Sequence, residues 1–251
     1  MRAPAHRPPV LFAGEPGSFA EDAVIAAFGD AAEAQGVPSF REVVERVEAR
    51  AAPAGVLPIE NVVFGTIRET YDLLAEIPVG IVGEVIVPVR LCLAALPGER
   101  IEAIDRVYSH VQALGQAERF LRTRPWSLLA TANTAGSGKM IRDRAERGSA
   151  AVLSPRAAHL FGLEVLAHDI QTEPRNRTRF LILAADPAAV PPRRHPPEGR
   201  RGTTLLVGVR NEPGALHRVL GVLAAHGLNM RSEEHTSELQ SLAYLVCRLL
   251  L

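Results

Sequence analysis

The sequence predicts an α/β fold with two lobes, followed by a smaller βαβ module. Apolar, β-branched runs alternate with segments of helical periodicity from residue 10 to 185, which is typical of sheets flanked by helices rather than of a β-sandwich or a helical bundle. This region is large for one doubly wound sheet, so we expect two lobes. A Pro- and Arg-rich stretch at 186–201 has the composition of a linker and separates the α/β region from residues 202–230.

The first half of the α/β region contains several predicted strands and three predicted helices. "GEPGSF" is a turn that leads into the first helix, in which apolar residues recur at helical spacing. A second helix begins at Ser39, because Glu42 three residues later completes a capping box. Ile67, Tyr71 and Leu74 mark the third helix. The predicted strands are "VLFA" (10–13), "AGVLPIEN" (54–61), "VGIVGEVIV" (79–87) and "RLCLAAL" (90–96).

The second half continues the alternation. A strand at "RVYSH" is followed by a helix over 112–121, and a strand near Leu128 by a helix from Ala135 to Arg144. Such alternation favours parallel sheets. Three further predicted strands lie within "AAVLS" (150–154), "EVLAHDI" (164–170) and "RFLILAA" (179–185).

Composition excludes several classes of protein. The formal net charge is +0, so the chain lacks the electrostatic footprint of a nucleic-acid or anionic-membrane binder. Cys92 and Cys247 are the two cysteines, without a CxxC pair, and no His, Asp or Glu cluster has metal-ligand spacing; we therefore expect neither a disulfide framework nor a metal site. The apolar run near the N-terminus, "VLFA", is too short for a signal peptide or a membrane span, which predicts a cytoplasmic protein.

Two glycine-containing stretches are candidates for anion contacts. In "GEPGSF", two glycines precede a helix N-terminus, where free N–H groups and the helix dipole favour a carboxylate or phosphate. The alternative is an ordinary tight turn with Ser18 as the N-cap. "NTAGSGKM" (133–140) departs from the P-loop pattern at both ends, which argues against ATP or GTP, yet it starts a helix that suits a second anion contact.

Polar side chains also end two predicted strands, where open α/β sheets bind ligands. Glu60 and Asn61 end one strand, and Ser109 and Gln112 follow another. "NRTRF" (176–180) adds a threonine between two arginines at the start of a strand. Together these loops suit a small polyanionic substrate without a cofactor, with acid help from a hydroxyl held near an arginine. A solute-binding module of the same architecture would need the same loops without the chemistry.

Taken together and in order, six stretches resemble prephenate dehydratase. They are "GEPGSFAEDA", "LPIENVVFGTI", "SHVQALGQ", "TAGSGKMI", "AAVLSPRAAHLFGL" and "NRTRF". That family converts prephenate to phenylpyruvate, with loss of water and carbon dioxide, on the way to phenylalanine. The resemblance implies a catalytic domain over 8–185 with two lobes similar to type II periplasmic binding proteins and an active site between them. The chain would cross twice, giving lobe 1 at about 8–83 and 170–185 and lobe 2 at about 84–169.

The resemblance also implies roles for individual residues. Thr178 matches the essential threonine and would donate a proton to the leaving C4 hydroxyl. Arg179 would hold a substrate carboxylate, a task suited to guanidinium, and Arg177 would be a solvated or lobe-contact residue. Phe180 would pack at the floor of the site. Further substrate contacts are implied at Ser18, Phe19, Asn61, Ser109, Gln112 and Thr134.

Some positions depart from the family pattern. Val62 stands where the family usually has serine after "PIEN", and Val111 replaces proline in "SHPQA". Ser137 and Gly138 replace a common alanine pair, and the form "TAGSGKMI" also looks like arogenate dehydratases, which act on the amino analogue. Both prephenate and arogenate therefore stay open as the substrate.

Residues 203–230 resemble the start of an ACT domain, the ferredoxin-like module that binds phenylalanine in this family. "EPGAL" carries the matching ligand motif at Gly214, Ala215 and Leu216, but the companion "ESRP" motif is absent after "LNM". We therefore expect an incomplete effector site and weak or absent inhibition by phenylalanine. Because the family is usually dimeric or tetrameric, we also expect a homo-oligomer.

The last stretch has a different character. "RSEEHTSELQS" (231–241) resembles the translation of a widely used sequencing adapter, and it is polar where the βαββαβ module should continue with a strand pattern. We therefore expect residues 231–251 to be non-native, and the native chain to continue from residue 230 as a full ACT domain.

Overall fold

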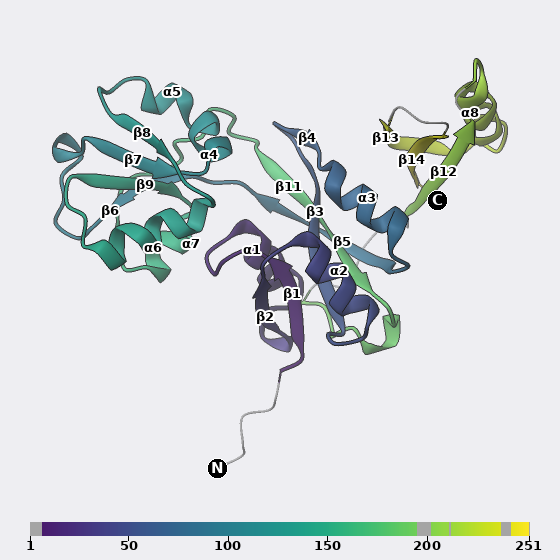
Figure 1. Cartoon of the computed structure of the whole chain (residues 1–251), viewed down its shortest axis with the longest axis horizontal. Coiled ribbons are helices and arrows are strands. Elements are labelled where there is room, and N and C mark those ends of the chain that lie inside the picture. The colour runs from purple at the N-terminus through teal and green to yellow at the C-terminus, as the bar shows by residue number, and fades with distance from the viewer. Residues whose placement is uncertain (1–6, 195–201, 211, 237–241, 251) are drawn as a thin grey trace, which may run out of the picture. The chain divides into compact units, whose positions relative to one another are not determined.

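The computed structural model describes residues 7–194, 202–210, 212–236 and 242–250. The chain divides into two compact units, Met1–His195 and Pro196–Leu251 (Figure 1). The first unit contains two separate sheets, each with its own helices, and the second unit contains one sheet.

The first sheet has the strand order β2-β1-β3-β11-β5, with the short β4 paired to β3. β1 is parallel to β2 and β3, whereas β11 is antiparallel to both of its neighbours. Ser18 and Ser39 cap α1 and α2, because each hydroxyl accepts a hydrogen bond from the N–H three residues later, as expected for both helix starts. The elements are β1 (Pro9–Ala13), α1 (Phe19–Phe28), η1 (Gly29–Ala31), β2 (Glu33–Val37), α2 (Phe40–Glu48), β3 (Ala54–Asn61), β4 (Gly65–Thr66), α3 (Arg68–Glu76), β5 (Gly80–Pro88) and β11 (Arg177–Ala184).

The second sheet has the order β10-β6-β9-β7-β8. Asn133 and Ser154 cap α6 and α7, and both helices start just beyond the carboxyl ends of the strands that precede them. The elements are β6 (Cys92–Ala95), η2 (Ile101–Ala103), β7 (Arg106–Ser109), α4 (Val111–Gln116), α5 (Glu118–Leu121), β8 (Ser127–Ala130), α6 (Thr134–Arg144), β9 (Ser149–Leu153), α7 (Pro155–Leu160) and β10 (Glu164–Ala167).

The chain passes between the two sheets twice. β5 belongs to the first sheet through Pro88, and β6 starts the second sheet at Cys92. β10 ends at Ala167, and β11 begins at Arg177 back in the first sheet. The expected lobe boundary at residue 83 is therefore too early, because β5 pairs with β11 along its whole length.

Both sheets are mixed, which corrects the expectation of parallel sheets. Parallel pairs join β1 to β2 and β3, and β7 to β8 and β9. β11 is antiparallel to β3 and β5, and β6 is antiparallel to β9 and β10. Parallel neighbours need a crossover connection that brings the chain back to its starting end. The two connections between the sheets, residues 89–91 and 168–176, are not crossovers of this kind. The strands that follow them, β6 and β11, are therefore antiparallel to their neighbours.

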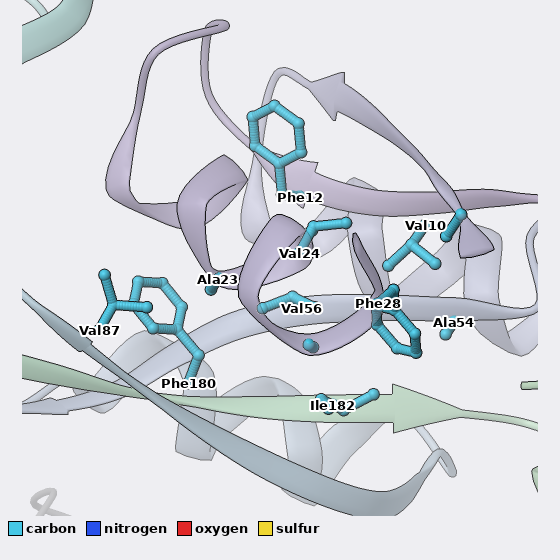
Figure 2. Close-up of a cluster of buried hydrophobic side chains, with 12 residues drawn as sticks. Val10, Phe12, Ala23, Val24, Phe28, Ala54, Val56, Val87, Phe180 and Ile182 are labelled. Atoms are coloured by element: carbon cyan, nitrogen blue, oxygen red, sulfur yellow. The ribbon is translucent and has the colours of Figure 1, made fainter. Parts of the chain in front are cut away.

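Strand β11 fixes which residues face which core. Phe180 and Ile182 belong to the apolar cluster beneath α1, where Figure 2 shows Phe180 beside Val87. Leu181 and Leu183 belong to the cluster on the opposite face, with residues of α2 and α3. Thr178 lies opposite Val87 in the sheet register and two residues before Phe180. Because strand residues alternate between faces, Thr178 lies on the α1 face.

Four details of the first unit depart from the sequence patterns. β2 was not expected, because "EAQGV" has almost no apolar periodicity, and α7 was not expected either. The helix predicted over 112–121 is interrupted at Ala117, which separates α4 from α5. Residues 186–194, predicted as a solvated linker, contain η3 (Pro187–Ala189) and contact the first sheet region, since Arg194 N–H donates to the carbonyl of Ala27 (2.8 Å). Residues 195–201 lie outside the described residues.

The second unit contains β12 (Gly202–Arg210), α8 (Ala215–Ala225), β13 (Asn229–Thr236) and β14 (Leu242–Leu250). Its antiparallel sheet has the order β12-β14-β13. β13 continues through Thr236, past residue 230, where we expect the native part of the sequence to end; the origin of residues 231–251 stays a prediction. β13 has one neighbour in this sheet, and polar residues are common on such edge strands. Residues 237–241 of the proposed non-native tail lie outside the described residues.

Candidate active site

The antiparallel register of β3 and β11 brings Asn61 opposite Thr178. Both residues are buried, with 7% and 8% of their surface exposed. The Asn61 Nδ2 group donates to Thr178 Oγ1 at 2.9 Å and to Asn176 Oδ1 at 3.0 Å, with a longer contact to the carbonyl of Arg177 at 3.3 Å. Residues from "PIEN" and "NRTRF", which lie 115 or more positions apart, therefore form one hydrogen-bonded cluster.

The orientation of the Asn61 side chain is fixed by the loop that follows it. The N–H groups of Val63 and Phe64 both donate to Asn61 Oδ1, at 2.9 and 3.1 Å. Since two backbone donors can only face a carbonyl oxygen, Nδ2 must be the end that faces Thr178 and Asn176.

This orientation determines what the Thr178 hydroxyl can do. Thr178 Oγ1 accepts the hydrogen bond from Asn61, and Asn61 is its one hydrogen-bond partner among the residues that the structure describes. A hydroxyl has one hydrogen to donate besides its acceptor lone pairs. The Thr178 O–H is therefore free to donate to a bound molecule, which is the property that a general acid needs.

Asn176 was quoted within "NRTRF" but was not predicted as a site residue. Its side chain is 2% exposed and completes the cluster through Oδ1. Its Nδ2 atom is buried without a hydrogen-bond partner among the described residues. The sequence signal was alternation, since the charged Arg177 and Arg179 separate the uncharged residues 176, 178 and 180.

Arg179 occupies a different place from the one expected. Its guanidinium donates to Glu60 at 2.8 Å and pairs with Glu84 at 3.5 Å, and its side chain is 11% exposed. Alternation along β11 places Arg179 on the face opposite Thr178. The expectation of a carboxylate-binding arginine beside Thr178 is therefore corrected: Arg179 links the three strands β3, β11 and β5 through two ion pairs. Arg177 is exposed, in line with its expected solvated position.

Two backbone donors of the loop at Ser18 are already occupied. Gly17 N–H donates to the Glu21 carboxylate at 2.6 Å, and Ser18 N–H donates to the carbonyl of Glu15 at 3.2 Å. The Ser18 hydroxyl caps α1, which fits the ordinary-turn interpretation, and the N–H groups of Gly17 and Ser18 are not available as anion contacts. Phe19 packs against the apolar clusters of both sheets, and Phe180 lies within the core of the first sheet.

The expected contacts from the second sheet lie in three different settings. Ser109 is fully buried and donates its hydroxyl to the carbonyl of Val152 at 2.7 Å, so it stabilises the sheet rather than facing a substrate. Gln112 is exposed near the start of α4, and Thr134 is half-buried at the start of α6. Within the described ranges, no hydrogen bond or ion pair joins these three residues to Thr178.

The two lobes of the first unit meet where α1 and α7 begin. Arg156 forms ion pairs with Glu21 (2.5 Å) and Asp22, and Ser154 Oγ donates to the carbonyl of Gly17 at 3.2 Å. A methyl group at Gly17, whose φ is +90°, would lie 2.9 Å from the Ala157 side chain. Burial raises the pKa of the Asp22 carboxyl, although Arg156 opposes this effect.

In the second unit, the motif predicted to bind phenylalanine starts α8. Gly214 adopts the left-handed conformation (φ 80°) as the N-cap, which favours glycine. Ala215 is buried and Leu216 packs against Leu223. These positions build the helix start and the small core of this unit.

The described residues contain no group of three or more His, Cys, Asp or Glu side chains placed to hold a metal ion. They also contain no helix that is both long and apolar enough to cross a membrane. Burial raises the pKa of the Cys92 thiol to about 12, so this cysteine stays protonated near neutral pH.

Comparison with known families gives two matches. The family model for prephenate dehydratase matches residues 10–188, and that for the ACT domain matches residues 203–245. The second match extends past residue 230, where we expected the native part of this sequence to end.

Proteins with similar sequences or structures include dehydratases and one protein named for a different activity. Arogenate dehydratase 1 of Petunia hybrida is 38% identical over 227 residues, which are 90% of this chain and 52% of that protein. A prephenate dehydratase of Arthrobacter aurescens, solved in complex with L-Phe, has a TM-score of 0.82 and 30% identity, covering 96% of this chain and 80% of that one. A structure described as GqqA, a quorum quenching acylase, has a TM-score of 0.83 and 29% identity, covering 96% and 87%. The chain spans about half the length of the plant relative.

Proposed function

Because the chain belongs to the prephenate dehydratase family, we propose that it converts prephenate to phenylpyruvate, with loss of water and carbon dioxide. The family match covers the residues of both lobes, including Asn61, Thr178 and the strands that carry them. The same match favours an enzyme over a solute-binding module on the same scaffold.

The observation that carries the proposal is the state of the Thr178 hydroxyl. Asn61 is locked by two backbone N–H groups and donates to Thr178 Oγ1, so the threonine proton remains available. A buried, neutral hydroxyl suits protonation of a leaving hydroxyl group, because water does not compete for its hydrogen bond.

In the proposed reaction, Thr178 O–H donates to the C4 hydroxyl oxygen of prephenate as the C–O bond breaks. The electron pair of the bond between the ring and its carboxylate moves into the ring, and carbon dioxide leaves. The ring becomes aromatic, which supplies the driving force. The task of the protein is therefore to orient the substrate and to stabilise charge on the leaving oxygen.

Arogenate is the alternative substrate, because it differs from prephenate in carrying an amino group in place of the side-chain keto group. Purified protein would be assayed with both compounds at equal concentration, and the products phenylpyruvate and phenylalanine separated by chromatography. We expect phenylpyruvate from prephenate at the higher kcat/KM. A higher kcat/KM for arogenate would reassign the substrate, and a folded protein that turns over neither compound would overturn the dehydratase proposal.

We further propose that the second unit is the effector module, with phenylalanine as its ligand near Gly214, Ala215 and Leu216. The ACT match supports this proposal, as does the L-Phe bound by the solved relative. The missing "ESRP" motif leads us to expect weak binding. Cytoplasmic location and homo-oligomeric assembly remain predictions, which cell fractionation and analytical ultracentrifugation would test.

The origin of residues 231–251 also remains a prediction. Their similarity to a translated adapter suggests a non-native tail, whereas the described part of the tail forms strands and the ACT match reaches residue 245. Sequencing genomic DNA across codon 231 separates the two cases. Reads that continue unchanged into codons 231–251 would show that the tail is native.

A further inference from the structure

The side chain of Asn176 has a hydrogen-bond donor that nothing in the described part of the chain uses. Asn176 is 2% exposed, and its Nδ2 atom is buried without a partner. Buried amide groups in folded proteins are almost always hydrogen-bonded, so a free donor at such a place needs an explanation. Functional sites are a common explanation, because a ligand then supplies the missing acceptor.

The position of this donor is not an accident of side-chain orientation. Asn61 must present Nδ2 toward Asn176, because Val63 and Phe64 hold its oxygen. Asn176 in turn must present Oδ1 toward Asn61, at 3.0 Å, which leaves its own Nδ2 at the free end of the group. Turning the amide over would place two N–H₂ groups against each other.

The backbone of Asn176 is also held on both sides. Its N–H donates to the carbonyl of Glu173 at 3.2 Å, and its carbonyl accepts from Val89 N–H at 2.9 Å. Because Val89 lies in the first crossing between the lobes, Asn176 sits where both crossings meet. The free donor is therefore fixed in place before any ligand binds.

The surroundings indicate which kind of acceptor fits. Asn61 donates to both Asn176 and Thr178, so the two side chains lie on either side of one amide group. Arg179 is not available to pair with a charged ligand here, because it faces the opposite side of the sheet and pairs with Glu60 and Glu84. An unpaired carboxylate would be expensive to bury here, whereas an uncharged hydroxyl oxygen would not.

We propose, building on the dehydratase function above, that Asn176 Nδ2 donates a hydrogen bond to the hydroxyl oxygen of the substrate that Thr178 protonates. Thr178 supplies the proton, the C–O bond breaks, and the electron pair passes to the leaving oxygen, which departs as water; the Thr178 oxygen regains its proton from solvent water when the products leave. Asn176 exchanges no proton and stabilises the negative charge that develops on that oxygen. Asn61 positions both donors. Since Nδ2 is covered, a substrate oxygen reaches it only when neighbouring side chains move aside on binding.

The substitution Asn176→Asp tests this role, because it keeps Oδ1 for Asn61 and replaces the free donor by an oxygen. At pH 8 we expect kcat/KM to fall about 100-fold, the loss seen when one donor to a developing oxyanion is removed. At lower pH the introduced carboxyl takes up a proton and regains a donor, so the ratio to wild type should recover about tenfold by pH 5.5. A purely structural role would not produce this recovery.

Gln171→Glu provides the matched control, because Gln171 is a buried amide of the same unit whose Oε1 accepts from Leu91 N–H at 2.9 Å. It makes the same amide-to-carboxyl change away from Thr178, although Gln171 also hydrogen-bonds to Asp169, so we expect a loss of stability while kcat/KM stays within about twofold of wild type at both pH values. If Asn176→Asp gives no cooperative melt, Asn176→Ser replaces it, and the same loss is expected without recovery at low pH.

The outcomes distinguish the role of Asn176 from the dehydratase function on which it rests. An active wild type with an Asn176→Asp variant of unchanged kcat/KM, or with a loss equal at pH 8 and pH 5.5, would overturn the role of Asn176 alone. Unchanged kcat/KM in Asn176→Ser would do the same. A folded wild type that turns over neither prephenate nor arogenate would overturn the dehydratase proposal and this role with it.

Discussion

Replacing Asn61 by leucine removes the centre of the buried polar cluster while keeping a side chain of similar size. Two groups lose the partner that the structure gives them, Asn176 Oδ1 and Thr178 Oγ1. The Arg177 carbonyl retains the N–H of Val62 at 3.0 Å. The N–H groups that held Asn61 belong to exposed residues, so water replaces the lost acceptor there.

The expected loss of stability follows from the two buried groups. Each buried polar group left without a partner costs about 1–3 kcal/mol, so the free energy of unfolding should fall by about 2–6 kcal/mol. Trp126 is the single tryptophan and packs in the core of the second sheet, so its fluorescence during urea unfolding reports on the first unit. The transition of Asn61→Leu should move to clearly lower urea concentration.

Asn133→Ala is the control for this measurement. Asn133 caps α6 with one hydrogen bond to the N–H of Gly136, and losing such a cap costs about 1 kcal/mol. If the unfolding free energy of Asn61→Leu is within about 1 kcal/mol of wild type, or no lower than that of Asn133→Ala, the buried cluster does not have the structure described above.

Three further predictions concern the lobe contact, Arg179 and the effector module. Burial raises the pKa of Asp22 in the folded state, so this carboxyl contributes less to stability as the pH rises from the usual aspartate pKa through the raised one. Arg156→Ala removes the cation that pairs with the ionised carboxyl, so it should lower the melting temperature more at pH 8 than at pH 4.5. An equal loss at both pH values would contradict this reasoning. Arg179→Lys should lower the melting temperature and leave KM for prephenate within about threefold, whereas a rise of tenfold or more would restore Arg179 as a carboxylate ligand. Titration with phenylalanine should leave prephenate turnover nearly unchanged, and strong inhibition at physiological concentrations would show that the effector site is complete.

The sequence predicted elements where a local signal was strong. The helix start at Ser39 and the apolar strand before Asn61 were predicted because they depend on neighbouring residues. β2 was missed because "EAQGV" lacks periodicity, and its place beside β1 comes from pairing rather than from its own composition. The strand directions were also missed, since they depend on how the chain crosses between sheets.

The same distinction applies to the candidate site. Thr178 and Asn61 were selected through the family resemblance, but their hydrogen bond depends on a register between strands far apart in sequence. Arg179 was assigned to the substrate through the family resemblance, which does not take account of the strand alternation that places residues 178 and 179 on opposite faces. Ser109 was misassigned because its hydroxyl is used within the sheet, which no local pattern indicates.

The central claim is that the free proton of Thr178 drives loss of the substrate hydroxyl. The most direct test compares kcat/KM for prephenate in wild type, Thr178→Ser and Thr178→Val. Serine keeps the hydroxyl and should retain much of the activity, whereas valine keeps the shape and should lower kcat/KM by about 10²–10⁴-fold, the usual contribution of a general acid. A Thr178→Val variant that folds and matches wild type in kcat/KM would contradict the account.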